Sequence, residues 1–201
     1  YQLLAAQQAI SGSTLLVMPT GLGKTAVQWM SMAEAMKGNG KIVLVAPTTG
    51  LVAQQARMAK EFINLEQERI VTMTGSDRPA KREDMWKGAK IVMATPHVIR
   101  NEARNGRILL SEIDLLIVDE AHHATGSDSM AQLGDLYLES SPNAMILAAT
   151  ASPGVKAGKV LEVIQRLGIE RLHVTKREED LVQPYITSMD IKKHELNLPE
   201  K

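Results

Sequence analysis

The sequence predicts an α/β domain built on a doubly wound parallel sheet with helices on both faces. Short apolar runs rich in β-branched residues recur along the chain, at residues 13–18, 41–46, 69–74, 89–95, 114–119 and 143–150. Their apolar residues are nearly continuous rather than alternating, which is typical of strands buried on both faces. Between them lie segments such as 24–37 and 50–62, where apolar residues recur at helical spacing. This alternation indicates a parallel sheet, in which ligands bind outside the carboxyl ends of the strands.

The first strand leads into a predicted phosphate-binding loop. Residues 18–25, MPTGLGKT, match the pattern G-x-x-x-x-G-K-[ST] at Gly23, Lys24 and Thr25, but Met18 stands where the first glycine is expected. A strand-like backbone would accommodate Met18, because glycine is needed only at positive φ or where a ligand approaches closely. Loop N–H groups would face phosphate oxygens, Lys24 would add a charge and Thr25 a hydroxyl for Mg²⁺. The predicted nucleotide-binding residues of the loop are Thr20, Gly21, Leu22, Gly23, Lys24 and Thr25.

Two other interpretations of this loop explain less. A strand-to-helix turn that uses glycines for tightness accounts for neither Lys24 nor Thr25. A dinucleotide-binding loop requires the pattern G-x-G-x-x-G, and the segment G-L-G-K-T lacks its third glycine. The phosphate loop of a nucleotide hydrolase remains the favoured interpretation.

The strand at residues 114–119 ends in two adjacent carboxylates, Asp119 and Glu120. Burying them without a cation would be costly, so their position predicts a metal and a reaction. Asp119 suits the shell of a magnesium ion, and Glu120 suits a general base that activates an attacking water. A helix N-terminus enriched in acidic residues explains one carboxylate but not the pair followed by His122. Zinc is not expected at His122 and His123, because neighbouring side chains point apart and no third ligand follows at zinc spacing.

Composition limits the range of functions. The 201 residues are 44% hydrophobic and 23% charged, as in an ordinary globular domain. Lys and Arg number 23 and Asp and Glu number 23, so any nucleic-acid binding would depend on local contacts rather than on net charge. Zero cysteines exclude disulfides and cysteine-bound zinc. No membrane span or signal peptide is seen, so we expect a cytoplasmic protein, or a nuclear one in a eukaryote.

The regular pattern of strands and helices stops near residue 176. A charged patch, KREED, is followed by a segment that reads as a turn and an extended stretch. We therefore expect a single domain over residues 1–175 and an exit segment over residues 176–201, which would lead to a second domain that this chain lacks.

Five segments, in order along the chain, resemble the motifs of a superfamily-two DEAH-type helicase. They are PTGLGKT at 19–25, APTTGLVAQQ at 46–55, ATPH at 94–97, DEAH at 119–122 and TAS at 150–152. The likeness covers residues 1 to about 155 and is to the first motor domain of such helicases. The tail, with LGIERLHV and LNLPE, is similar to the archaeal Hef and FANCM-like branch. The resemblance implies a RecA-like fold, ATP and Mg²⁺ as cofactors, a nucleic-acid partner and a second RecA-like domain.

The resemblance also assigns roles to individual residues. Gln2 matches the glutamine that contacts adenine, while His122, Thr150 and Ser152 match the residues that couple nucleotide state to domain movement. The residues that would contact the sugar-phosphate backbone of nucleic acid are Pro47, Thr48, Gly50, Thr74, Gly75, Thr95 and Pro96. For each threonine, a helix N-cap is the alternative role, and both roles are compatible. Arg57, Arg78, Lys81 and Arg82 are expected to add charge near this surface.

The predicted function is that of an ATP-driven nucleic-acid motor. The branch similarity implies DNA as the partner, in the repair of branched or stalled forks. A second domain would supply an arginine to the ATP site, so the present chain alone should be nearly inactive. An RNA helicase and a nucleic-acid sensor switched by ATP remain alternatives. A kinase or metabolic ATPase with a small substrate is a further class, but it does not explain the segments TAS and APTTGLVAQQ.

Overall fold

A computed structural model describes residues 1–152 and 157–185 of the chain. Within them a single parallel sheet has the strand order β3-β4-β2-β5-β6-β1-β7. The strands are β1 (Thr14–Val17), β2 (Lys41–Val45), β3 (Ile70–Met73), β4 (Ile91–Ala94), β5 (Ile113–Asp119), β6 (Ile146–Thr150) and β7 (Arg171–Val174). This is the doubly wound parallel sheet that the sequence predicts.

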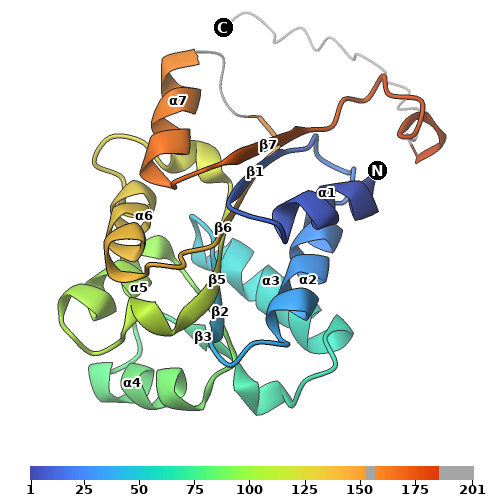
Figure 1. Ribbon diagram of the computed structural model, residues 1–201. Helices are drawn as coiled ribbons and strands as arrows, with labels where there is room; N and C mark the ends of the chain where they lie inside the picture. Colours follow the sequence, from blue (N-terminus) through green and yellow to red (C-terminus); the bar gives the residue numbers. More distant parts are fainter. Residues whose placement is uncertain (153–156, 186–201) are drawn as a thin grey trace, which may run out of the picture.

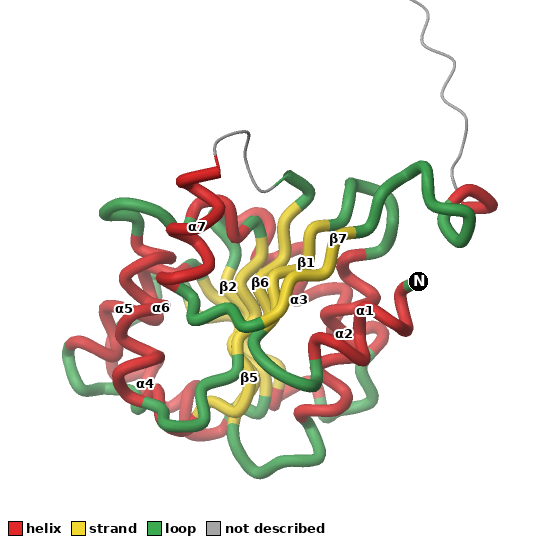
Figure 2. The backbone as a smooth tube through the Cα atoms, turned by 45° about the horizontal axis from the view of Figure 1, so that its top comes forward, coloured by secondary structure: helices red, strands yellow, loops and turns green. Residues whose placement is uncertain are grey.

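Helices cover both faces of the sheet, as Figures 1 and 2 show. One face is covered by α1 (Gln2–Ala9), α2 (Lys24–Ala35) and α3 (Thr49–Phe62). The opposite face is covered by α4 (Pro79–Gly88), α5 (Pro96–Arg104), α6 (Ser129–Ser140) and α7 (Ala157–Arg166). Each predicted strand is therefore buried on two sides, which explains the continuous apolar runs in the sequence.

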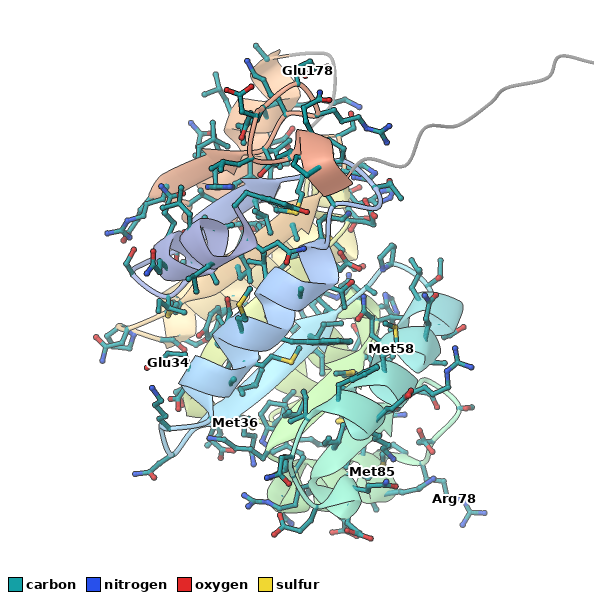
Figure 3. All side chains as sticks on the ribbon, turned by 90° about the vertical axis from the view of Figure 1, so that its right-hand side faces the viewer. Glu34, Met36, Met58, Arg78, Met85 and Glu178 are labelled. Carbon is teal, nitrogen blue, oxygen red and sulfur yellow. The ribbon has the colours of Figure 1, made fainter. Side chains whose placement is uncertain are left out.

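Side chains of each central strand alternate between two hydrophobic cores. Along β1, Leu15 and Val17 belong to the core beneath α4–α7, whereas Leu16 belongs to the core beneath α1–α3. The helices carry matching apolar faces, and flexible methionines fill space both inside the cores, as Met32 and Met93 do, and at their margins. Met36 packs against one core and Met85 against the other (Figure 3). The methionines serve packing, as their number in the sequence suggests.

The strand β7 (Arg171–Val174) is the element that the sequence pattern misses. It lies at the edge of the sheet, where it pairs with β1 in parallel, Leu172 opposite Leu15 and Val174 opposite Val17. Its side chains are mostly exposed, and the sequence RLHV alternates charged or polar with apolar residues. An edge strand lacks the continuous apolar run by which the other strands are recognised.

The first part of the predicted exit segment packs against the domain. The side chain of Val182 is fully buried in the core beneath α1–α3. A short 3₁₀ helix follows at Gln183–Tyr185. The rest of the predicted exit segment, residues 186–201, lies outside the described residues. The boundary at residue 175 between a domain and an exit segment stays a prediction.

Candidate functional site

The loop between β1 and α2 has the conformation that a phosphate-binding loop requires. The backbone of Met18 still pairs as a strand, because its N–H donates to the carbonyl oxygen of Thr150 at 3.0 Å. Its side chain is fully buried in the core beneath α1–α3. Among the described residues, Glu120 is the one non-glycine with positive φ, so Met18 needs no glycine-like backbone. The strand-like backbone on which the accommodation of Met18 depends is therefore present, and phosphate binding by this loop stays a prediction.

The two glycines of the loop are required for different reasons. Gly21 and Gly23 have φ angles of 87° and 88°, in the left-handed region that favours glycine. A Cβ on Gly23 would lie 2.0 Å from the side-chain nitrogen of Gln2, whereas a Cβ on Gly21 would meet no described atom within 4 Å. Gly21 therefore faces open space, where a phosphate could approach the backbone closely.

The N-terminus of α2 presents its amides to the same space. Gly23 is the N-cap residue, and none of the described side chains caps the helix. The first turn thus keeps free N–H groups and the positive end of the helix dipole, beside Lys24 and Thr25. Together with the open side of Gly21, these donors fit the phosphates of a nucleotide.

Residues at the start of the chain bind the back of this loop. The hydroxyl of Tyr1 donates to the carbonyl oxygen of Leu22 at 3.0 Å, and Nε2 of Gln2 donates to the same oxygen at 3.1 Å. Arg177, from the C-terminal part of the chain, donates to the carbonyl oxygen of Thr20 at 3.5 Å. The structure thus places Gln2 against the loop, as the resemblance implies, and its contact with adenine stays a prediction.

The end of β5 brings the two carboxylates to the loop. Nζ of Lys24 lies 3.1 Å from Oε1 of Glu120, and both side chains are half-buried. The backbone of Glu120 is left-handed, with φ 53° and ψ 46°. Such a conformation costs roughly 1–3 kcal/mol for a non-glycine residue and is found at functional sites. The strain aims the Glu120 side chain at the phosphate loop.

Asp119 is buried and is held by two glutamines. Nε2 of Gln28 donates to its Oδ1 at 3.2 Å, and Nε2 of Gln55 donates to its Oδ2 at 3.4 Å. Burial raises the pKa of Asp119, although the charge of Lys24 opposes the shift. The Oε1 atoms of both glutamines are buried and have no partner among the described residues. A carboxylate in this setting favours a nearby cation, so the site fits Mg²⁺.

Sequence reasoning did not single out Gln28 and Gln55 as site residues. Gln28 has no exposed surface and Gln55 is 8% exposed, although glutamine is usually a surface residue. Their positions in the sequence could have indicated this role, because both glutamines lie among apolar residues on the faces of α2 and α3 that pack on the sheet. A polar residue on such a face needs a hydrogen-bond partner, and here that partner is Asp119.

His122 connects the end of β5 with the end of β6. Its Nδ1 lies 3.0 Å from Oγ1 of Thr150 and 3.3 Å from Oε2 of Glu120. Thr150 Oγ1 donates to the carbonyl oxygen of Ser152 at 2.9 Å and accepts from its N–H at 3.2 Å. The three residues predicted to couple nucleotide state to movement are therefore in contact, and that role stays a prediction.

The neighbouring His123 departs from the sequence-based expectation. The rings of His122 and His123 lie 4.2 Å apart between centroids, so the two side chains do not point apart. They belong to the 3₁₀ helix Ala121–His123, whose geometry differs from the helix or strand assumed. Burial and the His123 ring lower the pKa of His122, which keeps its imidazole neutral at pH 7. In the described part of the chain, no group of three His, Cys, Asp or Glu is arranged to hold a metal.

The predicted nucleic-acid residues follow neighbouring strands at the same sheet edge. Ala94, the last residue of β4, pairs with Val45 at the end of β2 and with Met73 at the end of β3. The segments that follow these three strands therefore begin side by side. A groove of about 190 Å³ is lined by Pro47, Thr95 and Pro96, together with His97, His123, Asp128, Ser129 and Met130. The structure thus brings three of the predicted residues into one groove.

The other predicted contacts have local roles as well. Thr48 is the N-cap of α3, where its hydroxyl accepts from the N–H of Leu51 at 3.3 Å. Gly50 lies in the exposed first turn of that helix. Thr74 donates its hydroxyl to Asp77 at 2.6 Å, and Gly75 next to it is exposed. The N-cap alternative holds for Thr48, while Thr74 instead closes its own loop.

The prediction that Arg82 adds positive charge to the surface is wrong. Arg82 is buried, with its side chain 10% exposed, and it pairs with Glu102 at 2.8 Å. It cannot add charge to the surface, because its guanidinium is neutralised inside the protein. Arg57, Arg78 and Lys81 are exposed, and Lys81 pairs with Asp77 at 2.7 Å.

The fold and the site together define a nucleotide-binding domain of the phosphate-loop class. Comparison with known proteins narrows this class. The profile of the DEAD/DEAH box helicase family matches residues 1–158. The chain therefore belongs to the DEAD/DEAH box helicase family. None of the helices in the described ranges is long and apolar enough to cross a membrane.

Three relatives are similar over all or nearly all of the chain. The Putative ATP-dependent RNA helicase MJ1505 of Methanocaldococcus jannaschii is 38% identical over 202 residues, 100% of this chain and 26% of that protein. The Fanconi anemia group M protein of Gallus gallus is 30% identical over 100% of this chain and 10% of its own length. The ATP-dependent DNA helicase mph1 of Neurospora crassa is 32% identical over 95% of this chain and 16% of its own length. The chain thus spans about a quarter or less of these relatives.

A solved structure supports the fold directly. The crystal structure of the Pyrococcus furiosus Hef helicase domain matches with a TM-score of 0.91 and 35% sequence identity, over 94% of this chain and 40% of that one. The domain built on this seven-stranded sheet therefore has the RecA-like fold of a helicase domain, as the resemblance implies. The similarity to the branch that contains Hef and FANCM is confirmed.

Proposed function

We propose that this chain is the ATP-binding first motor domain of an ATP-dependent DNA helicase or translocase. The proposal depends on the 3.1 Å ion pair between Lys24 and Glu120, which joins the phosphate loop to the end of β5. Hydrolysis of ATP needs a cation for the terminal phosphates and a group that orients the attacking water. Both groups lie here within hydrogen-bond distance of each other, at the sheet edge where such folds bind ligands.

The proposed site divides its work among few residues. Backbone amides around Gly21 to Lys24 would hold the phosphates, although the N–H of Leu22 donates to the carbonyl oxygen of Pro19 at 3.2 Å in this structure, and Lys24 would neutralise the terminal phosphates. Thr25 and Asp119 would hold Mg²⁺, which supplies positive charge to the developing transition state when bound. Glu120 would accept the proton of the attacking water. Gln2 would contact the adenine from its place behind the loop.

Nucleic acid would lie across the carboxyl ends of β2, β3 and β4. Hydroxyls and helix N-termini there suit a sugar-phosphate backbone and need no strongly basic surface. The proposed contacts are Pro47, Thr48, Gly50, Thr74, Gly75, Thr95 and Pro96. The balanced net charge of the chain agrees with contacts of this local kind.

DNA is the proposed partner, with single-stranded or branched DNA at repair forks as its form. The name of the Neurospora relative favours this assignment over RNA, although the Methanocaldococcus relative is named an RNA helicase. A second RecA-like domain would supply the arginine that completes the ATP site. We infer a cytoplasmic setting, or the nucleus in a eukaryote.

The test is to measure ATP hydrolysis by the intact protein alone, with single-stranded DNA, with forked DNA and with RNA of the same sequence. A DNA motor should be stimulated most by the DNA substrates. Equal or greater stimulation by RNA would favour an RNA helicase. Hydrolysis that no nucleic acid changes would contradict the proposed function altogether.

A further inference from the structure

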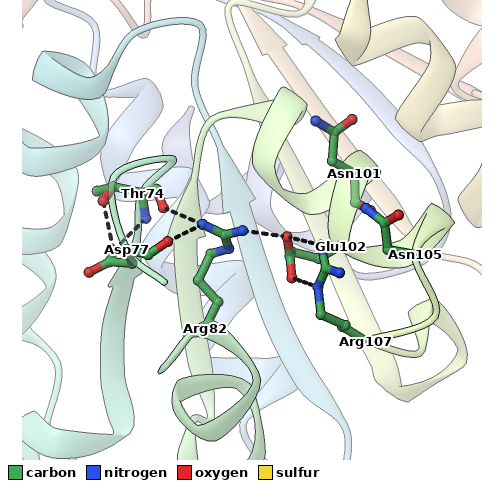
Figure 4. A network of polar contacts seen from close by, with 7 residues as sticks. All are labelled: Thr74, Asp77, Arg82, Asn101, Glu102, Asn105 and Arg107. Carbon is green, nitrogen blue, oxygen red and sulfur yellow. Dashed lines mark hydrogen bonds and ion pairs between the residues drawn. The ribbon is translucent and has the colours of Figure 1, made fainter. Parts of the chain in front are cut away.

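A buried arginine joins the loop after β3 to helix α5 (Figure 4). Nη1 of Arg82 donates to the carbonyl oxygen of Thr74 at 3.3 Å and to that of Asp77. Its Nη2 donates to Oε1 of Glu102 at 2.8 Å. The side chains of Arg82 and Glu102 are 10% and 2% exposed. Since both terminal nitrogens of Arg82 are engaged inside the protein, this residue does not contact a bound phosphate.

Glu102 is a fixed anchor for this arginine. Nε of Arg107 donates to its Oε2 at 2.6 Å, and Nη2 of Arg107 donates to its Oε1 at 3.0 Å. The hydrogen bonds from Arg107, and then the one from Arg82, hold the pKa of Glu102 below its usual range. The carboxylate therefore stays charged, with both oxygens bound, on helix α5.

The loop at the other end of Arg82 is closed upon itself. Both the N–H and the hydroxyl of Thr74 donate to Oδ2 of Asp77, at 3.0 Å and 2.6 Å. Hydrogen bonds from Lys81 and Thr74 lower the pKa of Asp77 to about 2. Arg82 then binds two carbonyl oxygens of this closed loop. The whole loop is thereby attached to Glu102 as one unit.

The bridge connects two segments that are proposed to contact nucleic acid. Thr74 and Gly75 follow β3, and Thr95 and Pro96 follow β4, which pairs with β3 through Met73 and Ala94. Glu102 lies about two turns beyond Pro96 on the same helix. Strand pairing sets where the two segments begin, but it does not fix the loop beyond Thr74. The Arg82 bridge supplies that constraint.

We propose that Arg82 is a positioning residue for nucleic-acid binding. By holding the 74–77 loop against α5, it presets the spacing between the Thr74–Gly75 and Thr95–Pro96 contacts. Without it, the position of this loop relative to α5 would have to be fixed when nucleic acid binds, and that ordering would reduce the affinity. The proposal rests on the proposed function, because it assumes that these segments contact nucleic acid.

The experiment compares Arg82→Met with the wild type in the intact protein. Binding of a fluorescent single-stranded DNA is followed by anisotropy over a range of salt concentrations. We expect the affinity to fall about 10-fold, as ordering one or two more loop residues would cause. The slope of log affinity against log salt should stay unchanged, because no phosphate contact is lost. Removing a direct contact to a single strand would instead reduce the slope by about 0.7.

Arg78→Met is the matched control. Arg78 is exposed at the start of the same helix and lies at the edge of the molecule (Figure 3), so this change removes an equal charge from the surface. DNA affinity should fall less in Arg78→Met than in Arg82→Met. The slope of log affinity against log salt should be reduced in Arg78→Met, because a surface charge is lost. Glu102→Gln keeps an acceptor for Arg82 but weakens the bridge. It should therefore reduce DNA affinity by less than Arg82→Met does, and the slope of log affinity against log salt should stay unchanged.

Two further measurements separate positioning from general damage. Hydrogen exchange at residues 74–78 should accelerate in Arg82→Met, while the affinity for ATP should stay within about twofold of the wild type. Wild-type DNA affinity in both Arg82→Met and Glu102→Gln would overturn the proposal. A reduced salt slope in Arg82→Met would also overturn it, as would a loss of ATP affinity equal to the loss of DNA affinity. Failure of the wild type itself to bind any nucleic acid would contradict the proposed function instead.

Discussion

Lys24 and Glu120 are paired across the candidate site at 3.1 Å, although 96 positions separate them in the sequence. In this arrangement the lysine that we propose to bind phosphates is paired with the carboxylate that we propose to activate water. Binding of ATP therefore has to exchange one anionic partner of Lys24 for another. The same event would release Glu120 toward the attacking water, so phosphate binding and preparation of the base are linked.

Lys24→Ala should weaken ATP binding by at least about 10-fold, because a charge-assisted hydrogen bond is lost. The fold should persist, since the Glu120 side chain left without its partner is 29% exposed and can be hydrated. Calorimetry with ATP and Mg²⁺ measures the affinity. Lys37→Ala, at an exposed position just beyond α2, is the control and should bind normally. Normal affinity in Lys24→Ala would remove Lys24 from the site.

Glu120→Gln in the intact protein should bind ATP almost normally and lower turnover by a factor on the order of 100 or more, as loss of a general base does. Asp119→Asn should instead weaken binding that depends on Mg²⁺. Steady-state hydrolysis and a magnesium titration of nucleotide binding distinguish the two. Identical behaviour of both variants in both assays would mean that the division of roles is wrong.

Gln55→Leu should weaken Mg²⁺ binding in the ATP complex by about 10- to 100-fold, the usual effect of losing a partner that orients a metal ligand. Its Nε2 is one of two side-chain donors that hold Asp119. The magnesium dependence of nucleotide binding gives the readout. Gln54→Leu, at the exposed neighbouring position, is the matched control. An unchanged magnesium dependence in Gln55→Leu would show that Gln28 alone orients the carboxylate.

Thr150→Val should leave ATP hydrolysis within about threefold of the wild type and reduce DNA unwinding at least about 10-fold. The substitution keeps the shape of a fully buried residue but removes the hydroxyl that joins His122 to Ser152. Comparing hydrolysis with strand separation in one preparation tests this. Thr14→Val, also fully buried but bonded to Gln8 and Gly12, controls for the lost hydroxyl itself. Equal loss of both activities would mean that Thr150 serves the chemistry rather than the coupling.

The 201-residue chain alone should bind ATP weakly and hydrolyse it very slowly. An arginine supplied in trans contributes a factor of about 1,000 to 100,000 in related phosphate-loop enzymes, and we expect a second domain to supply it. Adding that domain, made separately or joined covalently, should raise DNA-stimulated hydrolysis steeply. Rapid DNA-dependent turnover by residues 1–201 alone would contradict a site shared between two domains.

Much of this arrangement could be predicted from the sequence because buried parallel strands and a phosphate loop have local patterns. The loop, Asp119 and Glu120 were recognised in this way, and the fold brings them together as expected. Arg82 could not be recognised, because its burial depends on Glu102, a partner that only the folded chain brings near. The partner of Gln55, Asp119, is also distant, 64 positions away, and the one local signal of its role is its place among apolar residues on the buried face of α3. Contacts between distant polar residues leave little trace in the local sequence.

The left-handed backbone at Glu120 opposes thermal stability to the catalytic role that we propose for this residue. Glycine and asparagine adopt this conformation more readily than glutamate, so either would relieve strain there. Each would also remove the carboxylate. A screen that selects only for a higher melting temperature would therefore favour inactive variants at this position, and a heat-resistant active enzyme has to be built from changes elsewhere in the domain.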